Sequence, residues 1–83
     1  MKLLYFAWVR QKIGRSEEEL VLPPGVTTVA SLVDFLRRRG EGYAAAFAKP
    51  ELLRCAVNQE HKRFDARVGP DDEVAFFPPV TGG

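Results

Sequence analysis

The first apolar run of the chain is predicted to form a central strand. Residues 3–9 are rich in aromatic and branched side chains, and both of their alternating sets of positions are apolar. A run of this kind is typical of a strand that is covered on both faces. A polar turn follows at residues 10–14, and residues 17–22 form a second predicted strand that stops at Pro23. The short link between the two strands predicts a hairpin.

The clearest helix of the sequence is predicted to begin after Thr28, whose side-chain oxygen can cap a free backbone N–H. Arginines at positions 37–39 fall in the last turn, where the helix dipole favours cations, and Gly40 suits a left-handed exit. We interpret the arginine run as a solvated helix end rather than an anion site. One apolar stripe recurs at helical spacing and defines the buried face: Val29, Leu32, Val33 and Leu36.

The second half of the chain is predicted to add strands to the same sheet. We predict a short helical turn at residues 43–47, a third strand at 52–58 and a turn at 59–63. A brief pairing follows at residues 64–67, then a tight turn at 69–72 and a last strand at 73–77. This order favours an α+β fold in which one main helix packs on one face of a mixed sheet. We therefore expect a β-grasp, or ubiquitin-like, domain over residues 1–77, with the first and last strands side by side in the middle. Residues 78–83 are expected to be a flexible C-terminal Gly-Gly tail.

Composition narrows the class of protein. The 83 residues are enough for one compact domain, and the net charge of +1 gives no electrostatic case for nucleic acid or a membrane surface. The single cysteine, Cys55, rules out an internal disulfide and a four-cysteine iron–sulfur centre. A lone thiol fits a reducing compartment, so we expect a cytoplasmic protein. We also expect that the protein binds no metal or cofactor.

Charged residues mark which face of the sheet should lie outside. In the last strand, Glu73 shares its face with Phe77, and in the first strand Lys2 shares its face with Phe6 and Trp8. If charged side chains mark the outer face in every strand, Phe6, Trp8 and Phe77 lie together on the outer face of the sheet. An apolar patch of this kind usually marks a partner surface. The alternative is that Phe6 and Trp8 pack under a loop.

The end of the sequence carries the candidate chemistry. After Phe77 the chain reads Pro78-Pro79-Val80-Thr81-Gly82-Gly83. Two prolines cannot extend a central strand, and the final two residues have no Cβ, so they can thread a narrow passage. Such an arm can present a terminal carboxylate at a distance from a rigid body. Adenylation would activate that carboxylate, and attack by sulfur on the adenylate would leave a thiocarboxylate, whose sulfur is a good nucleophile.

Other polar residues are better explained by structure. His61 has no neighbouring serine or second cysteine with which to form a catalytic set, and we interpret it as an exposed turn residue. The acidic residues 71–73 lack the spacing of a cation site. Cys55 falls on the inferred core face, and glutamates 17–19 are interpreted as a charged edge strand that discourages unwanted pairing.

The sequence from Asp72 to Gly83, DEVAFFPPVTGG, resembles the C-terminus of molybdopterin synthase small subunits. The segments Leu4–Ala7 with Val9-Arg10, and Ala56–Asn58, are similar to the same family, so the resemblance covers essentially the full length. One departure is His61, at a predicted turn where the family has an apolar contact residue.

The resemblance implies that a ubiquitin-activating-type enzyme adenylates Gly83 with ATP and that the terminus is then converted to a thiocarboxylate. The tail, Pro78 to Gly83, would insert into the large subunit of the synthase, and its sulfur would pass to cyclic pyranopterin monophosphate. Since the product needs two sulfurs, two small and two large subunits would assemble. Phe6, Arg10 and Phe77 occupy positions that resemble the partner-contacting residues of the family.

Alternative functions remain open at the level of sequence. A sulfur carrier for thiamine synthesis or tRNA thiolation, or a ubiquitin-like modifier that forms amides with lysines, would pass through the same adenylate. An enzyme acting alone is disfavoured, because the sequence lacks a convergent set of polar catalytic groups.

Overall fold

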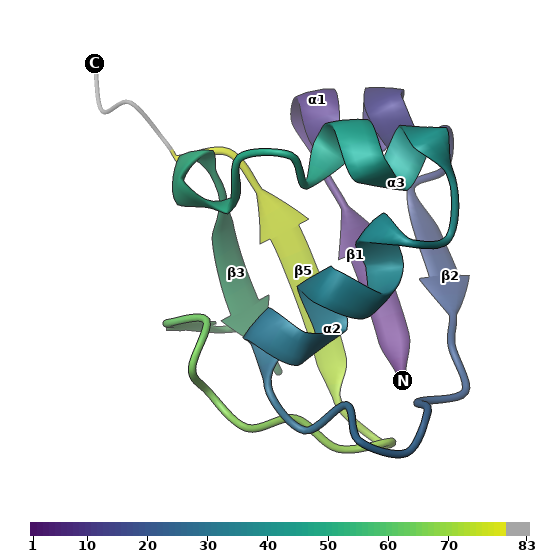
Figure 1. Ribbon diagram of the computed structural model, residues 1–83. Helices are drawn as coiled ribbons and strands as arrows, with labels where there is room; N and C mark the ends of the chain where they lie inside the picture. The colour runs from purple at the N-terminus through teal and green to yellow at the C-terminus, as the bar shows by residue number, and fades with distance from the viewer. Residues whose placement is uncertain (80–83) are drawn as a thin grey trace.

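The computed structural model describes residues 1–79, which form a five-stranded mixed sheet with helices on one side and at one end (Figure 1). The strand order is β2-β1-β5-β3-β4. As predicted, β1 and β5 lie side by side in the middle, and the structure shows that they run parallel. The pairs β1–β2, β3–β5 and β3–β4 are antiparallel. The strands are β1 (Lys2–Tyr5), β2 (Glu17–Glu19), β3 (Arg54–Val57), β4 (Glu60–Lys62) and β5 (Glu73–Phe77).

Three α-helices and one 3₁₀ turn accompany the sheet: α1 (Ala7–Ile13), α2 (Val29–Arg37), α3 (Glu41–Ala46) and η1 (Pro50–Leu52). Figure 1 shows α2 lying across one face of the sheet, while α1 and α3 sit together at the end where β5 stops. The predicted main helix is therefore confirmed, and two shorter helices join it.

The start of α2 follows from its capping residues. The Thr28 hydroxyl accepts from the Ser31 N–H at 3.1 Å, and the Ser31 hydroxyl oxygen accepts from the Thr28 N–H at 3.0 Å. This reciprocal pair satisfies two backbone donors that the first turn of a helix leaves free. The predicted exit is wrong, because Arg38 ends the helix in a right-handed conformation. Gly40 is instead extended, with φ 161°, and precedes α3.

The core lies between α2 and the inner face of the sheet. All four residues of the predicted helix stripe are buried, and Val74 and Phe76 of β5 are fully buried beneath them. Phe47, which follows α3, packs edge-on against Phe76 with ring centroids 5.0 Å apart. The inner face of the sheet contributes further buried side chains from β1 and β3, the two strands beside β5: Leu3, Tyr5, Cys55 and Val57. The predicted inner faces of these strands are confirmed.

The predicted strand over residues 3–9 is wrong in its second half. The strand ends at Tyr5, and Ala7 adopts a left-handed backbone conformation with φ 53° that turns the chain into α1. Val9 is fully buried from the helix rather than from a strand. Gly14, with φ 90°, ends α1 in the left-handed conformation that glycine adopts without a steric penalty. Residues 10–14 are thus mostly helix and not a turn.

The strands on either side also differ from the prediction. The second strand stops at Glu19 rather than at residue 22, and the third begins at Arg54, after η1. The predicted turn at residues 59–63 is largely β4, because the tight turn lies at Asn58 and Gln59, whose φ angles are 51° and 70°. Positive φ at both central residues is what a two-residue hairpin requires. The predicted brief pairing at residues 64–67 is reduced to one bridge, from Arg67 to the residue that caps α2.

The turn before β5 is fixed by Asp72. Its carboxylate accepts from the Gly69 N–H at 2.7 Å and from the side-chain amide of Asn58 at 3.0 Å. These hydrogen bonds, that of Asn58 first, hold the pKa of the Asp72 carboxyl below its ordinary value. The side-chain oxygen of Asn58, Oδ1, in turn accepts from the Glu73 N–H at 3.0 Å. The start of β5, and hence its register, is set by this local network.

Candidate functional site

The last described residues of the chain, Pro78 and Pro79, follow the end of β5. Phe77 is the last residue of β5, Pro78 is partly buried beyond it and Pro79 is exposed. The proposed reactive terminus, Gly82 and Gly83, and the predicted contact residues Val80 and Thr81 lie outside the described residues. The division into a body of residues 1–77 and a tail of residues 78–83 therefore stays a prediction.

The outer face of the sheet carries an apolar patch at the same end. In the middle of the sheet, Leu4 lies opposite Ala75, and Ala75 lies opposite Ala56. Phe6 continues the extended backbone beyond β1, and its N–H donates to the Phe76 carbonyl at 3.1 Å. Alternation therefore places the Phe6 side chain, which is 48% exposed, on the same face as Phe77. We call this set of residues, Leu4, Phe6, Ala56, Ala75 and Phe77, the outer-face patch.

His61 belongs to this surface and not to a turn, which corrects the prediction. It lies in β4 opposite Ala56, on the outer face. The small side chain of Ala56 lets the rings of His61 and Phe77 meet above it, with centroids 5.2 Å apart and planes inclined by 55°. The exposed imidazole thus forms the rim of the patch on the β4 side.

Trp8 and Arg10 are placed by α1 rather than by a strand. The expectation that Trp8 shares a face with Phe6 and Phe77 is wrong, because the chain turns at Ala7 and Trp8 packs toward α3 and η1. Arg10 is exposed on α1. The structure therefore brings Phe6 and Phe77 together and separates Trp8 from them.

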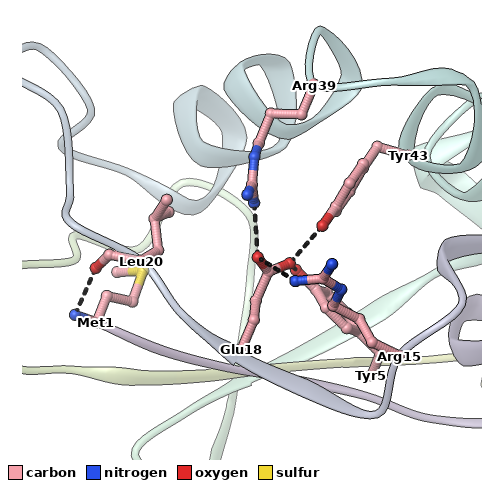
Figure 2. A network of polar contacts seen from close by, with 7 residues as sticks. All are labelled: Met1, Tyr5, Arg15, Glu18, Leu20, Arg39 and Tyr43. Carbon is pink, nitrogen blue, oxygen red and sulfur yellow. Dashed lines mark hydrogen bonds and ion pairs between the residues drawn. The ribbon is translucent and has the colours of Figure 1, made fainter.

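A buried carboxylate, which the sequence analysis did not single out, holds the helical end of the domain together (Figure 2). Glu18 lies on the inner side of β2, and its side chain is only 6% exposed. Its Oε2 accepts from the Tyr43 hydroxyl at 2.6 Å and from the Tyr5 hydroxyl at 2.8 Å, while Oε1 accepts from Arg39 at 2.9 Å. Arg15 contributes a longer contact of 3.5 Å.

The network shifts the pKa values of its members in ways that follow from burial and charge. Burial alone would raise the pKa of Glu18, but the hydrogen bonds from Tyr43, Tyr5 and Arg39 outweigh it and lower that pKa. Burial and the adjacent carboxylate raise the pKa values of both tyrosine hydroxyls. Arg39 also lies over the ring of Tyr43, with its guanidinium carbon 4.8 Å from the centroid. One carboxylate therefore joins β1, β2, α3 and the end of α2.

The described body offers no other reactive centre. The Cys55 thiol is buried and donates to the Lys62 carbonyl at 3.2 Å, and burial raises its pKa, which disfavours the thiolate. Within residues 1–79, no group of three or more His, Cys, Asp or Glu side chains is placed to hold a metal ion. In the same range, no helix has the length and apolar character needed to cross a bilayer.

A mixed sheet with parallel first and last strands in its middle and one main helix across it defines the ubiquitin-like β-grasp class. Residues 3–83 match the ThiS family. The chain is 40% identical to the molybdopterin synthase sulfur carrier subunit of Escherichia coli strain K12, over 100% of this chain and 99% of the relative. The chain belongs to the ThiS family and, within it, to the molybdopterin synthase sulfur carrier subunits.

Solved structures agree with this placement. The putative molybdopterin converting factor subunit 1 of Pyrococcus furiosus has a TM-score of 0.74 and 30% identity, covering 95% of each chain. SAMP1 of Haloferax volcanii has a TM-score of 0.73 over 100% of this chain and 98% of its own. At 24% identity, the likeness to SAMP1 shows the fold alone. The predicted fold class is thus confirmed.

Proposed function

We propose that this chain is the sulfur-carrying small subunit of a molybdopterin synthase and that the carboxylate of Gly83 is its working group. The observation that carries the proposal is the full-length similarity to sulfur carrier subunits, which continues through the terminal glycines. The relatives are named as sulfur carrier subunits, which supports a carrier rather than an enzyme that acts alone. We place this chemistry in the cytoplasm because a lone thiol suits a reducing compartment.

The proposed chemistry requires activation by a second protein. An oxygen of the Gly83 carboxylate attacks the α-phosphate of ATP on a ubiquitin-activating-type enzyme, and pyrophosphate leaves. Hydrosulfide supplied by a sulfide donor then attacks the acyl carbon, and AMP leaves. The sulfur of the resulting thiocarboxylate attacks cyclic pyranopterin monophosphate in the large subunit and displaces an oxygen of the precursor. Water then cleaves the acyl–sulfur bond, which leaves the sulfur on the precursor and returns the Gly83 carboxylate. The carrier binds no cofactor of its own in this scheme and contributes an unhindered terminus.

The outer-face patch is proposed as the surface that holds the large subunit. It combines an exposed aromatic ring, Phe6, with the partly buried ring of Phe77, the last residue of β5. A partner that covers the patch therefore also lies beside the start of the C-terminal segment. Aromatic side chains at the centre of an interface contribute most of its binding free energy. Because each product takes two sulfurs, we propose a complex of two small and two large subunits.

The proposal is tested by intact-mass spectrometry after incubation with ATP, a sulfide source and the cognate adenylating enzyme. We expect a mass gain equal to the replacement of one oxygen by sulfur. Deleting Gly83, or adding one residue after it, should abolish the gain and the transfer to the precursor, with an unchanged circular dichroism spectrum. Retained transfer by either variant would refute the mechanism. A Gly-Gly remnant on cellular lysines, without a thiocarboxylate, would instead identify a protein modifier.

A further inference from the structure

Helices α1 and α3 and the turn η1 enclose an apolar groove that is distinct from the outer-face patch. We call it the α1–α3 groove, and its volume is about 310 Å³. Trp8 from α1 and Leu52 from η1 are its large side chains, and Ala45 and Ala48 are among the small ones between them. Small residues at these positions leave the space open, since longer side chains there would fill it. Leu52 is 49% exposed, so its side chain is accessible to a partner.

The polar side-chain groups of the groove are all hydrogen-bond donors. Lys12 and Lys49 border it, and no aspartate or glutamate contributes to its walls. Both lysines are exposed, and neither forms an ion pair with an acidic side chain in residues 1–79. Apart from the two ammonium groups, the only side-chain polar group of the lining is the Trp8 indole N–H. An occupant must therefore supply an apolar group together with hydrogen-bond acceptors, preferably negative ones.

A protein segment matches these requirements better than a small ligand. A volume of about 310 Å³ lies at the lower limit of small-molecule pockets, which start at roughly 300 Å³ and carry several convergent polar groups. The groove offers an apolar floor with one cation on α1 and another beyond α3. An amphipathic helix with acidic residues beside its apolar stripe is complementary to that arrangement in shape and in charge.

We propose that the α1–α3 groove is a docking site for an acidic amphipathic helix of a partner protein. The helix would insert a leucine or phenylalanine side chain between Trp8 and Leu52, and its carboxylates would meet Lys12 and Lys49. This surface shares no residue with the outer-face patch. The proposal does not depend on the chemistry of the C-terminal glycines.

Trp8 is the only tryptophan in the sequence, so its fluorescence reports on the groove directly. The probe is a synthetic helical peptide without tryptophan or tyrosine, with leucines along one face and glutamates beside them. We expect a saturable blue shift of the Trp8 emission on titration, and a weaker affinity at high salt. A peptide with lysine in place of every glutamate should not bind.

Charge-reversal variants complete the test. The double variant Lys12→Glu/Lys49→Glu should weaken binding of the acidic peptide by at least about five-fold, since two attractions become repulsions. The matched control Arg63→Glu/Arg67→Glu changes the same net charge at exposed positions outside the groove and should leave the affinity unchanged. Leu52→Ala should also weaken binding, with a native circular dichroism spectrum. Equal binding of both peptides, an equal effect of the control variant, or no blue shift at millimolar peptide would overturn the proposal.

Discussion

Replacing Glu18 by alanine is expected to cost this domain a large part of its stability. The substitution leaves the Tyr5 hydroxyl, in a residue that is 1% exposed, without its acceptor, and an orphaned buried donor costs about 1–3 kcal/mol. The Tyr43 hydrogen bond of 2.6 Å and the Arg39 contact are lost as well. Both groups can turn to water, so they add less. We expect a total loss of about 3 kcal/mol in the free energy of unfolding.

The measurement is urea unfolding of the wild type and of two variants from the same strand. A chain of 83 residues should have a stability of roughly 4–12 kcal/mol, so a loss of this size is readily resolved. Glu19→Ala is the matched control, because Glu19 is exposed and one residue away, and it should change the stability by less than about 0.5 kcal/mol. If Glu18→Ala cost less than about 1 kcal/mol, the argument that the network holds the helices to the sheet would fail.

The lowered pKa of Glu18 predicts how the stability of the domain falls at acid pH. The pKa of Glu18 is lowered in the folded state, so its contribution is fully present above the unfolded value of 4.5. That contribution is lost as the pH falls through the lower folded pKa. The wild type should therefore lose stability below about pH 4.5, and Glu18→Ala should show a smaller loss over that interval. Parallel slopes for the two proteins would contradict the assignment.

Three further substitutions test separate parts of the structure. In a calorimetric titration, Phe77→Asp should weaken binding to the synthase large subunit at least ten-fold, roughly 1.4 kcal/mol. A variant that loses its tertiary packing would show instead that Phe77 belongs to the core. Ala7→Gly should raise the free energy of unfolding by about 0.5–1 kcal/mol, because glycine relieves the left-handed backbone at φ 53°. A destabilised variant would contradict that reason. Gly42→Ala should lower the melting temperature, because its Cβ would lie 2.5 Å from the Lys12 carbonyl oxygen, and an unchanged or higher value would show that α1 can move aside.

The parts of the fold that the sequence predicted well are those in which local signals agree with tertiary packing. The stripe from Val29 to Leu36 combines helical spacing with a capping threonine, and α2 forms where both place it. The strand Glu73–Phe77 follows a tight turn and alternates between inward and outward residues, and its bounds are as predicted. Its placement beside the first strand also followed from the order of elements.

The errors arise where a short-range pattern had two interpretations. The run from Leu3 to Val9 is apolar enough for a strand, but Val9 and Ile13 are also four residues apart and Gly14 can end a helix. The glutamates at 17–19 suggested a solvated edge, although strand alternation turns one of three consecutive residues inward. Glu18 can be buried only because Tyr5, Arg39 and Tyr43 converge on it, and they are distant in sequence. No local signal reveals such convergence.

The predictions about the candidate site were likewise right for some residues and wrong for others. Phe6 and Phe77 were placed together from charge alternation alone, and the structure puts both on the outer face. His61 was assigned to a turn because its flanking residues are polar, whereas the positive φ angles at Asn58 and Gln59 move the turn forward and set His61 against Phe77. The α1–α3 groove depends on how two short helices meet. The spacing of Trp8 and Lys12 on one helix face was a partial indication of it.

The pairing of β1 with β5 has a consequence for how the protein is made. These two neighbours come from opposite ends of the chain, so a nascent polypeptide cannot close its sheet until Phe77 has been synthesised. Contacts of this sequence separation also slow folding, because the chain must close a long loop before they form. A product truncated before β5 would leave β1 and β3 with unpaired edges, which favour aggregation. A folded body therefore shows only that translation has passed Phe77, and a chain that stops between residues 78 and 82 would fold but lack the terminal glycine.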